Sequence, residues 1–156
     1  MVSQFSLISR MEGLLEITAV DAADININYL KDKALSLSKA TRGAVFCIDK
    51  RKDDIYFDAD MADGSKKEIR IPLKAPSMVG TSIRGNEIIN IPDCYEDERF
   101  NPTTDLKTGF RTKQLLCVPV TTSKGEVIAA IQIINSADGL PFTEQDIEFL
   151  QVEHHL

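Results

Sequence analysis

The sequence contains no tryptophan and only two histidines, His154 and His155, which are adjacent and lie near its end. No internal histidine is therefore available for a Ser-His-Asp triad, a histidine-rich metal site or a haem ligand. The glycines are isolated, so neither the GxGxxG fingerprint nor the P-loop of nucleotide-binding enzymes is present. These absences predict that the chain is not an enzyme.

Cysteine is also scarce. Cys47, Cys94 and Cys117 are an odd number without a CxxC pair, which argues against a zinc knuckle or a redox dithiol. The longest apolar run, residues 127–131, is too short to cross a membrane. Residues 1–5 lack the basic and then apolar pattern of a secretory signal. We therefore expect a reduced, cytoplasmic protein that does not bind a membrane.

The charge and the length of the chain further limit the kinds of protein that it can be. The chain carries 24 acidic and 18 basic residues, a net charge of −6, whereas a nucleic-acid-binding domain needs a basic face for the phosphates. A length of 156 residues, with 43% apolar and 27% charged residues, is typical of one soluble domain with one core. We therefore expect residues 1–156 to form a single domain that does not bind nucleic acid.

Several segments have helical patterns. Apolar residues recur at three- and four-residue intervals over residues 21–40, which predicts an amphipathic helix with Asp21 or Asp24 as its N-cap. Thr143 is expected to open a helix, because Asp146 three residues on completes a capping-box-like pair. Further helices are predicted at residues 7–17, 77–83 and 100–111, the last with Asn101 as N-cap and Gly109 as its stop.

Apolar runs bounded by turn residues predict strands. The strongest, residues 126–134, is apolar on both faces and should be central in a sheet and covered on both sides. Pro119 implies an edge, a bulge or an end in its own strand. The other predicted strands are residues 44–48, 55–57, 67–72, 87–91 and 114–120. Strands joined by hairpins, with helices at both ends of the chain, indicate an antiparallel α+β fold.

An ordered series of motifs occupies the second half of the chain, at residues 90–95, 97–101, 105–112, 115–120, 125–128 and 131–135. In content and spacing, this series resembles the GAF domains of cyclic-nucleotide phosphodiesterases, adenylyl cyclases and sensor kinases. The resemblance implies a central antiparallel sheet of about six strands. It also implies that the N- and C-terminal helices pack on one face, while short helices and loops form a pocket on the other.

The resemblance further implies a ligand site for cAMP or cGMP, without a cofactor or a metal. In cyclic-nucleotide-binding relatives, the positions that line this site match Phe57, Asp58, Asp105, Thr108, Thr112 and Gln132. Asp105 and Thr108 are three residues apart and share one face of a helix, and Gln132 is polar within an apolar strand and must find a hydrogen bond. The residues by themselves are also compatible with local structural roles, in which the acid interacts with the helix end and the threonines with nearby backbone.

One motif departs from the family. The phosphodiesterase signature Asn-Lys…Phe…Asp-Glu reads Asn135-Ser136…Phe142…Asp146-Ile147 here. Because serine replaces the lysine, the family's Lys–Asp ion pair, which secures a lid region, cannot form.

Three functional hypotheses follow. The first is a regulatory, small-molecule-sensing domain of a larger signalling protein, which binds cAMP or cGMP and controls an attached effector through dimerising terminal helices. The alternative is a ligand-free module in which those helices only form a homodimer. The third is an enzyme of the free methionine sulfoxide reductase type, with Cys94 as an accessible thiol in a loop while the other two cysteines are buried.

Overall fold

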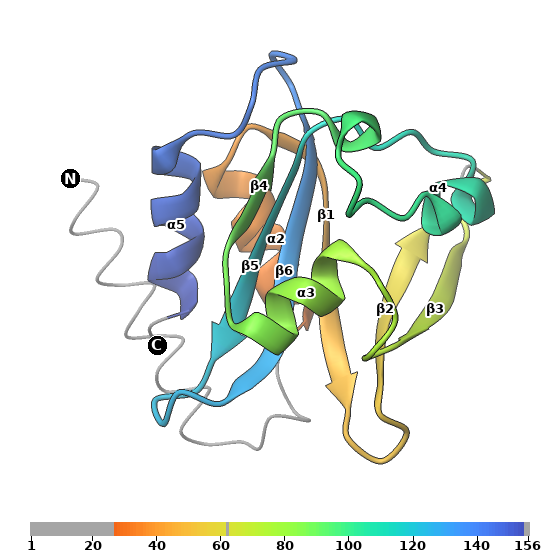
Figure 1. Ribbon diagram of the computed structural model, residues 1–156. Coiled ribbons are helices and arrows are strands. Elements are labelled where there is room, and N and C mark those ends of the chain that lie inside the picture. Colours follow the sequence, from red (N-terminus) through yellow and green to blue (C-terminus); the bar gives the residue numbers. More distant parts are fainter. Residues whose placement is uncertain (1–26, 62, 155–156) are drawn as a thin grey trace.

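The computed structural model describes residues 27–61 and 63–154 (Figure 1). Six strands form one sheet in the order β3-β2-β1-β6-β5-β4, and every neighbouring pair is antiparallel. The strands are β1 Ala40–Asp49, β2 Asp54–Asp60, β3 Lys66–Pro72, β4 Ile89–Ile91, β5 Leu115–Thr121 and β6 Val127–Ser136. The helices are α2 Ile27–Leu37, α3 Met78–Gly85, the 3-10 helix η2 Cys94–Glu96, α4 Thr103–Thr108 and α5 Glu144–His154. The predicted α+β class with a six-stranded antiparallel sheet is confirmed.

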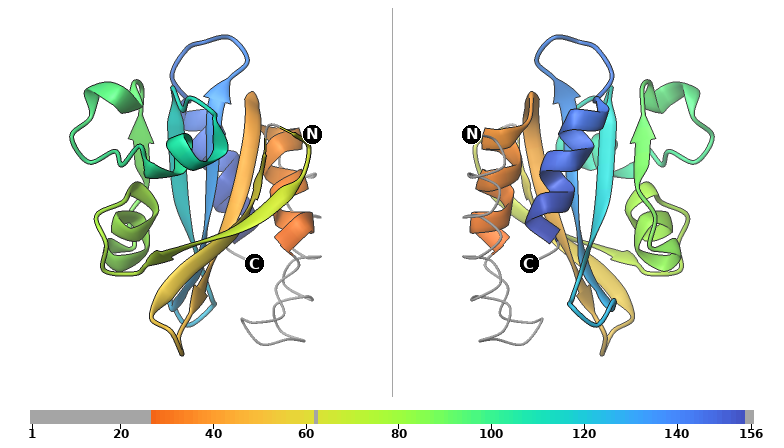
Figure 2. Two further views of the ribbon diagram at one scale, coloured as in Figure 1. Left: turned by 90° about the vertical axis from the view of Figure 1, so that its right-hand side faces the viewer. Right: turned by 90° about the vertical axis from the view of Figure 1, so that its left-hand side faces the viewer.

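The sheet separates two groups of helices. Figure 2 shows α2 and α5 next to each other on one face and α3 and α4 on the opposite face. Side chains alternate along β5 in the same way, because Leu116 and Val118 belong to the core beneath α2 and α5, whereas Leu115 and Cys117 belong to the core beneath α3. The face covered by α3 and α4 carries the pocket described below.

Strand β6 is central, as predicted, and lies between β1 and β5. Its residues Ile131 and Ile133 are 1% and 0% exposed and pack toward α2 and α5. Pro119 of β5 pairs with Ala130 of β6, but β4 pairs with β5 only as far as Cys117. Pro119 therefore lies where β5 has a strand partner on one side, next to a register irregularity at Val120, in agreement with the predicted edge or bulge.

The helix predicted at residues 21–40 is wrong at its end. Helix α2 ends at Leu37, because the Ser38 hydroxyl donates to the Ala34 carbonyl and accepts the Ala40 amide. Ala40 then pairs with Ser136 and begins β1, so β1 starts four positions before the predicted strand at residues 44–48. The proposed N-caps and the helix predicted at residues 7–17 lie outside the described residues.

The predicted helix at residues 100–111 is also too long, since α4 spans only Thr103–Thr108. The Phe100 amide donates to the Asp97 carbonyl in a turn. The N-cap is Pro102 and not the predicted Asn101, because the Asn101 side chain accepts the Thr103 amide at 3.0 Å in a turn that precedes the helix. At the other end Gly109 adopts a left-handed conformation, φ 71°, and stops the helix as predicted. Short loops therefore surround α4 on both sides.

The other helix starts agree with their predictions. Ser77 caps α3 by accepting the Gly80 amide. At α5, the Thr143 amide donates to Asp146 at 2.7 Å and the Asp146 amide donates to the Thr143 hydroxyl at 3.3 Å, which completes the predicted reciprocal cap. None of the helices in the described ranges is long and apolar enough to cross a membrane.

Candidate functional site

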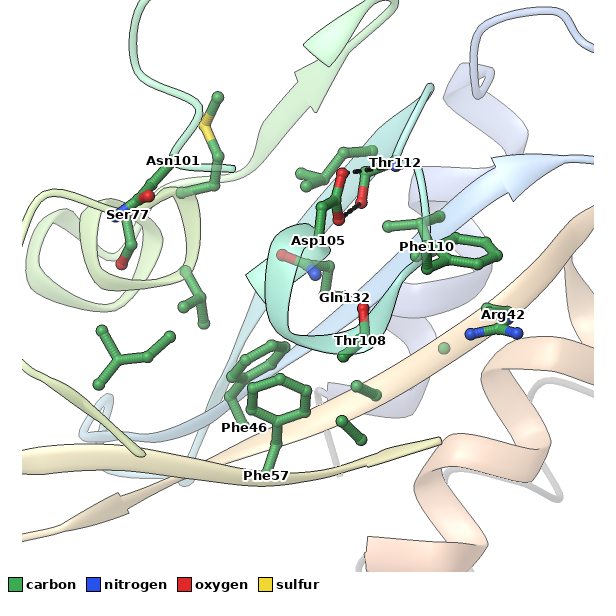
Figure 3. Close-up of a pocket in the computed structure, with 18 of the residues that line it drawn as sticks. Arg42, Phe46, Phe57, Ser77, Asn101, Asp105, Thr108, Phe110, Thr112 and Gln132 are labelled. Atoms are coloured by element: carbon green, nitrogen blue, oxygen red, sulfur yellow. Dashed lines mark hydrogen bonds between the residues drawn. The ribbon is translucent and has the colours of Figure 1, made fainter. Parts of the chain in front are cut away.

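A pocket with a cavity volume of about 120 Å³ lies between the sheet, α3 and α4 (Figure 3). Its walls come from the middle of β1, β2 and β6, from the start of α3, and from α4 with the loop that follows it. All six residues assigned to the ligand site from the sequence line this pocket: Phe57, Asp58, Asp105, Thr108, Thr112 and Gln132. The fold thus brings together positions that are up to 75 residues apart in the chain.

Asp105 is the centre of a hydrogen-bond cluster in the pocket wall. Its carboxylate accepts the Thr112 amide at 2.8 Å and the Thr112 hydroxyl at 2.6 Å, and it also accepts the Tyr95 hydroxyl at 2.7 Å. Asp105 and Thr112 are 8% and 5% exposed. The carboxylate joins α4 to the following loop, so its first role is structural, although it is not the interaction with the helix end that the local reading expected.

Tyr95 was missed in the sequence and completes this cluster from η2. Its hydrogen bond to Asp105 raises the pKa of the Tyr95 phenol above its usual 10.0, because the neutral phenol is the donor. The Arg111 guanidinium lies 4.0 Å from the centre of the Tyr95 ring, and the Phe100 ring lies 5.2 Å away on centroids. The loop around α4 is therefore held from its outer side as well.

Asp58 lines the pocket in a different way from Phe57. Side chains alternate along a strand, and Phe57 belongs to the core on the pocket face. Asp60, two residues after Asp58, pairs with Lys31 of α2 on the opposite face. The pKa of the Cys47 thiol is raised chiefly by burial and also by the charge of Asp58, and Cys47 packs against the α2 and α5 core. Alternation therefore places the Asp58 carboxylate on the face opposite to that of Phe57, although the residue is among those that line the cavity.

Arg42 of β1 is a pocket residue that the sequence interpretation missed. Its guanidinium lies 3.8 Å from the centre of the Phe110 ring (Figure 3), and it makes no ion pair within the described part of the chain. Among the described residues that line the pocket, Arg42 is the one cationic side chain. A strand predicted to begin at Ala40 would have revealed it, because Arg42 lies on the same face as Ala44 by alternation.

The opposite wall is aromatic and carries an amide. Phe46 and Phe57 stand 4.2 Å apart on ring centroids, and Figure 3 shows both rings below Gln132. Gln132 is half-buried between Ala44 and Cys117 in the sheet register. Its carboxamide has no hydrogen-bond partner among residues 27–61 and 63–154, so the partner that the sequence required is not supplied by this part of the protein.

The altered signature motif makes other contacts in place of an ion pair. The Ser136 hydroxyl donates to the Leu140 carbonyl, and Asp146 accepts the Thr143 amide and hydroxyl. Asn135, at φ 56°, accepts the Lys113 amide at 2.6 Å and donates to the Arg111 carbonyl at 2.9 Å. Asn135 therefore secures the loop after α4.

The cysteines differ from the sequence expectation. Cys94 is not an accessible loop thiol: it begins η2, is 0% exposed, and has a pKa raised to about 12, mainly by burial. Cys117 is buried as expected, with a pKa of about 12. Cys47 was expected to be buried but is the most accessible of the three, and its pKa is about 11. A buried thiol of high pKa is a poor nucleophile.

No group of His, Cys, Asp and Glu in the described ranges could hold a metal ion.

The site thus belongs to a domain with a central antiparallel sheet, paired helices on one face and a small pocket on the other. The family of GAF domains matches residues 13–152. The chain therefore belongs to the GAF domain family, as its motifs indicated.

Several curated relatives of the chain are cyclic-nucleotide phosphodiesterases. The chain is 34% identical over 148 residues to the probable 3',5'-cyclic phosphodiesterase pde-5 of Caenorhabditis elegans, covering 88% of this chain and 20% of the relative. It is 31% identical over 158 residues to the cGMP-specific 3',5'-cyclic phosphodiesterase of Drosophila melanogaster, covering 90% and 14%. The chain thus spans about a fifth or less of the length of these relatives.

Solved structures share the fold at low identity. The GAF domain of a phosphoenolpyruvate-protein phosphotransferase from Coxiella burnetii has a TM-score of 0.66 at 16% identity, covering 95% of this chain and 90% of that one. The free methionine-R-sulfoxide reductase of Neisseria meningitidis has a TM-score of 0.56 at 15% identity, covering 85% and 79%. At these identities the likeness concerns the fold alone.

Proposed function

We propose that this GAF domain is a regulatory sensor whose pocket binds a cyclic nucleotide, cAMP or cGMP. The observation that carries the proposal is that one cavity combines a cation and a half-buried amide, neither of which has an ion-pair or hydrogen-bond partner in the described part of the chain, with an aromatic wall. A cyclic nucleotide needs these three features, because it combines an anionic phosphate, a polar base edge and a flat ring.

Arg42 is the proposed phosphate ligand. Its guanidinium is held over Phe110 at 3.8 Å and has no carboxylate partner in the described residues. By contrast, Arg70 pairs with Asp49 and Asp54. A guanidinium without an acid beside it is suited to bind a phosphate oxygen through charge-assisted hydrogen bonds.

Gln132 is the proposed ligand for the base edge, with Phe46 and Phe57 against the ring. A carboxamide donates and accepts at once, so it can satisfy either purine. The acceptor-only carboxylate of a glutamate instead matches the two adjacent N–H donors of guanine. A Gln132→Glu variant should therefore raise the ratio of cGMP to cAMP affinity, by about 1–3 kcal/mol of discrimination. An unchanged ratio would remove Gln132 from the base edge.

Regulation is the proposed consequence of binding. The relatives are several times longer than this chain, which supports an attached effector, and α2 and α5 pack together on the face opposite the pocket. We propose that these helices pair two copies of the chain and carry the response. Sedimentation of the chain with and without nucleotide tests this step separately, and a monomer under both conditions would refute it.

The direct test is isothermal titration of the folded, nucleotide-free chain with cAMP and with cGMP. Saturable binding of either at one ligand per chain supports the sensor function, whereas the absence of binding with both leaves the ligand-free dimerisation module.

Arg42→Ala should weaken binding by about 1.5–3 kcal/mol, roughly 10- to 150-fold, which is typical of a lost hydrogen bond to a charged group. Arg51→Ala is the matched control, because Arg51 is exposed in the β1–β2 turn and does not line the pocket.

The reductase hypothesis is not supported by the site. Its thiol, Cys94, is buried in the core with a pKa of about 12, so little thiolate exists near neutral pH. We propose that the chain itself does not catalyse a reaction.

A further inference from the structure

Asn135 occupies an unusual position at the end of β6. It is one of three non-glycine residues with a left-handed backbone in the described chain, at φ 56°. Its side chain accepts the Lys113 amide at 2.6 Å and donates to the Arg111 carbonyl at 2.9 Å. Its backbone amide donates to the Gln114 carbonyl at 2.9 Å. The Asn135 side chain therefore binds the loop between α4 and β5 at the two residues that flank Thr112.

Thr112 connects the loop held by Asn135 to the pocket wall. Its amide and hydroxyl hold Asp105 at 2.8 and 2.6 Å, and Asp105 lies in α4, which forms part of the pocket wall. Asn135 itself does not line the pocket. It can affect a ligand only through the loop that it holds.

The same loop is tied to the segment that leads into α5. The Gln114 side chain accepts the Ser136 amide at 3.2 Å and donates to the Gly139 carbonyl at 3.1 Å. The Ser136 hydroxyl then donates to the Leu140 carbonyl. Residues 137–143 connect β6 to α5, so one set of hydrogen bonds spans the pocket wall and the approach to the C-terminal helix.

We propose that Asn135 is a positioning residue that fixes Asp105 and Thr112 in the pocket wall and, together with Gln114, couples this wall to α5. The part of this proposal that concerns a ligand rests on the proposed function, while the clamp itself does not. Asparagine suits the position for two reasons: it tolerates a left-handed backbone, and its amide supplies the donor and the acceptor that the clamp needs.

The clamp is tested by hydrogen exchange in the ligand-free chain. Asn135→Gly removes the side chain without backbone strain, because glycine adopts positive φ readily. Exchange in residues 111–113 and in α4 should become roughly 10- to 100-fold faster, since the hydrogen bonds that close the loop are lost. Asn86→Gly is the matched control: Asn86 is also left-handed, at φ 48°, but it caps α3 and does not line the pocket.

Unchanged exchange in residues 103–113 of the Asn135→Gly variant would overturn the proposal, as would an equal increase in the Asn86→Gly control. If Asn135→Gly does not fold by circular dichroism, Asn135→Asp replaces it. Aspartate keeps the acceptor for the Lys113 amide but places an acceptor oxygen against the Arg111 carbonyl in place of the donor, so faster exchange confined to the same loop is expected.

Coupling to α5 is tested with cAMP and cGMP as probes. Either nucleotide, once bound, should slow exchange in residues 103–113 and in the first turn of α5. In the Asn135→Gly, Gln114→Ala double variant, a saturating concentration of the nucleotide should slow exchange in residues 103–113 but not in α5. Equal slowing of α5 in both proteins would overturn the coupling. If neither nucleotide binds the unsubstituted chain, the proposed function fails. The positioning role of Asn135 is then still tested by hydrogen exchange in the ligand-free chain.

Discussion

Removal of the Asp105 carboxylate tests the description of the pocket wall most directly. In Asp105→Ala, the amide and hydroxyl of Thr112 lose their acceptor, and Thr112 is only 5% exposed. Each buried donor left without a partner costs about 1–3 kcal/mol, so the free energy of unfolding should fall by about 2–6 kcal/mol. The Tyr95 hydroxyl contributes little to this loss, because Tyr95 is 40% exposed and can turn to water.

Asp105→Asn should cost much less, about 1 kcal/mol. The amide oxygen can replace the carboxylate oxygen that accepts both the Thr112 amide and the Tyr95 hydroxyl. The new amino group then faces the Thr112 hydroxyl, which can rotate and accept instead of donate. The variant therefore keeps the geometry of the cluster and loses mainly the charge of the acceptor.

Equilibrium unfolding in urea, followed by circular dichroism, measures both variants on one scale. Asp93→Ala is the control, because Asp93 is exposed in the preceding loop and its side chain caps nothing. It should stay within about 0.5 kcal/mol of the unsubstituted chain. A loss below about 1 kcal/mol in Asp105→Ala, or equal losses in the alanine and asparagine variants, would refute the assignment of Asp105 as the acceptor that holds this loop.

Three further predictions concern other parts of the chain. The pKa of the Asp49 carboxyl is held below its usual 3.8, chiefly by its hydrogen bond from Arg70. This bond therefore adds stability above pH 3.8 and loses it as the pH falls through the lower folded pKa. Arg70→Gln should raise the NMR-measured pKa of Asp49 and leave that of Asp63, which is lowered by Ser65, unchanged. Ser77→Ala should cost about 0.5–2 kcal/mol in urea unfolding, because α3 loses its N-cap; no measurable loss would contradict the cap. Iodoacetamide at pH 7.5 should label the native chain slowly and the urea-unfolded chain quickly, and rapid native labelling would contradict the raised thiol pKa values of Cys47, Cys94 and Cys117.

Local patterns in the chain were sufficient for most of the secondary structure. Thr143 and Asp146 cap α5 as expected, and Gly109 ends α4, because a cap depends on residues only a few positions apart. The errors lie where distant strands decide the outcome. Ala40 continues the helical periodicity of α2, yet it pairs with Ser136, 96 residues later, and begins β1 instead.

The residues of the candidate site also fall into two groups: those that local motifs indicated and those that depend on contacts between distant segments. Family-specific spacing identified six positions in advance, and these line one pocket. It missed Arg42, because the sequence pattern placed the start of β1 too late, and it missed Tyr95, whose role depends on a hydrogen bond from η2 to Asp105. It also misjudged Cys94, since a cysteine in a loop-like segment becomes fully buried only once η2 packs into the core.

The amino-acid order thus suffices for the family and the antiparallel class, since both depend on motifs and periodicities that are local in the chain, and it also indicated six residues that the fold places around one pocket. The folded arrangement alone decides how those residues are used. The Asp105 carboxylate is used by Thr112 and Tyr95, the Asp58 carboxylate lies on the opposite face of the sheet, and Arg42 has no acidic partner among the described residues. These differences arise because strand register and loop packing set which side chains meet, and both depend on contacts between residues that are far apart in the sequence.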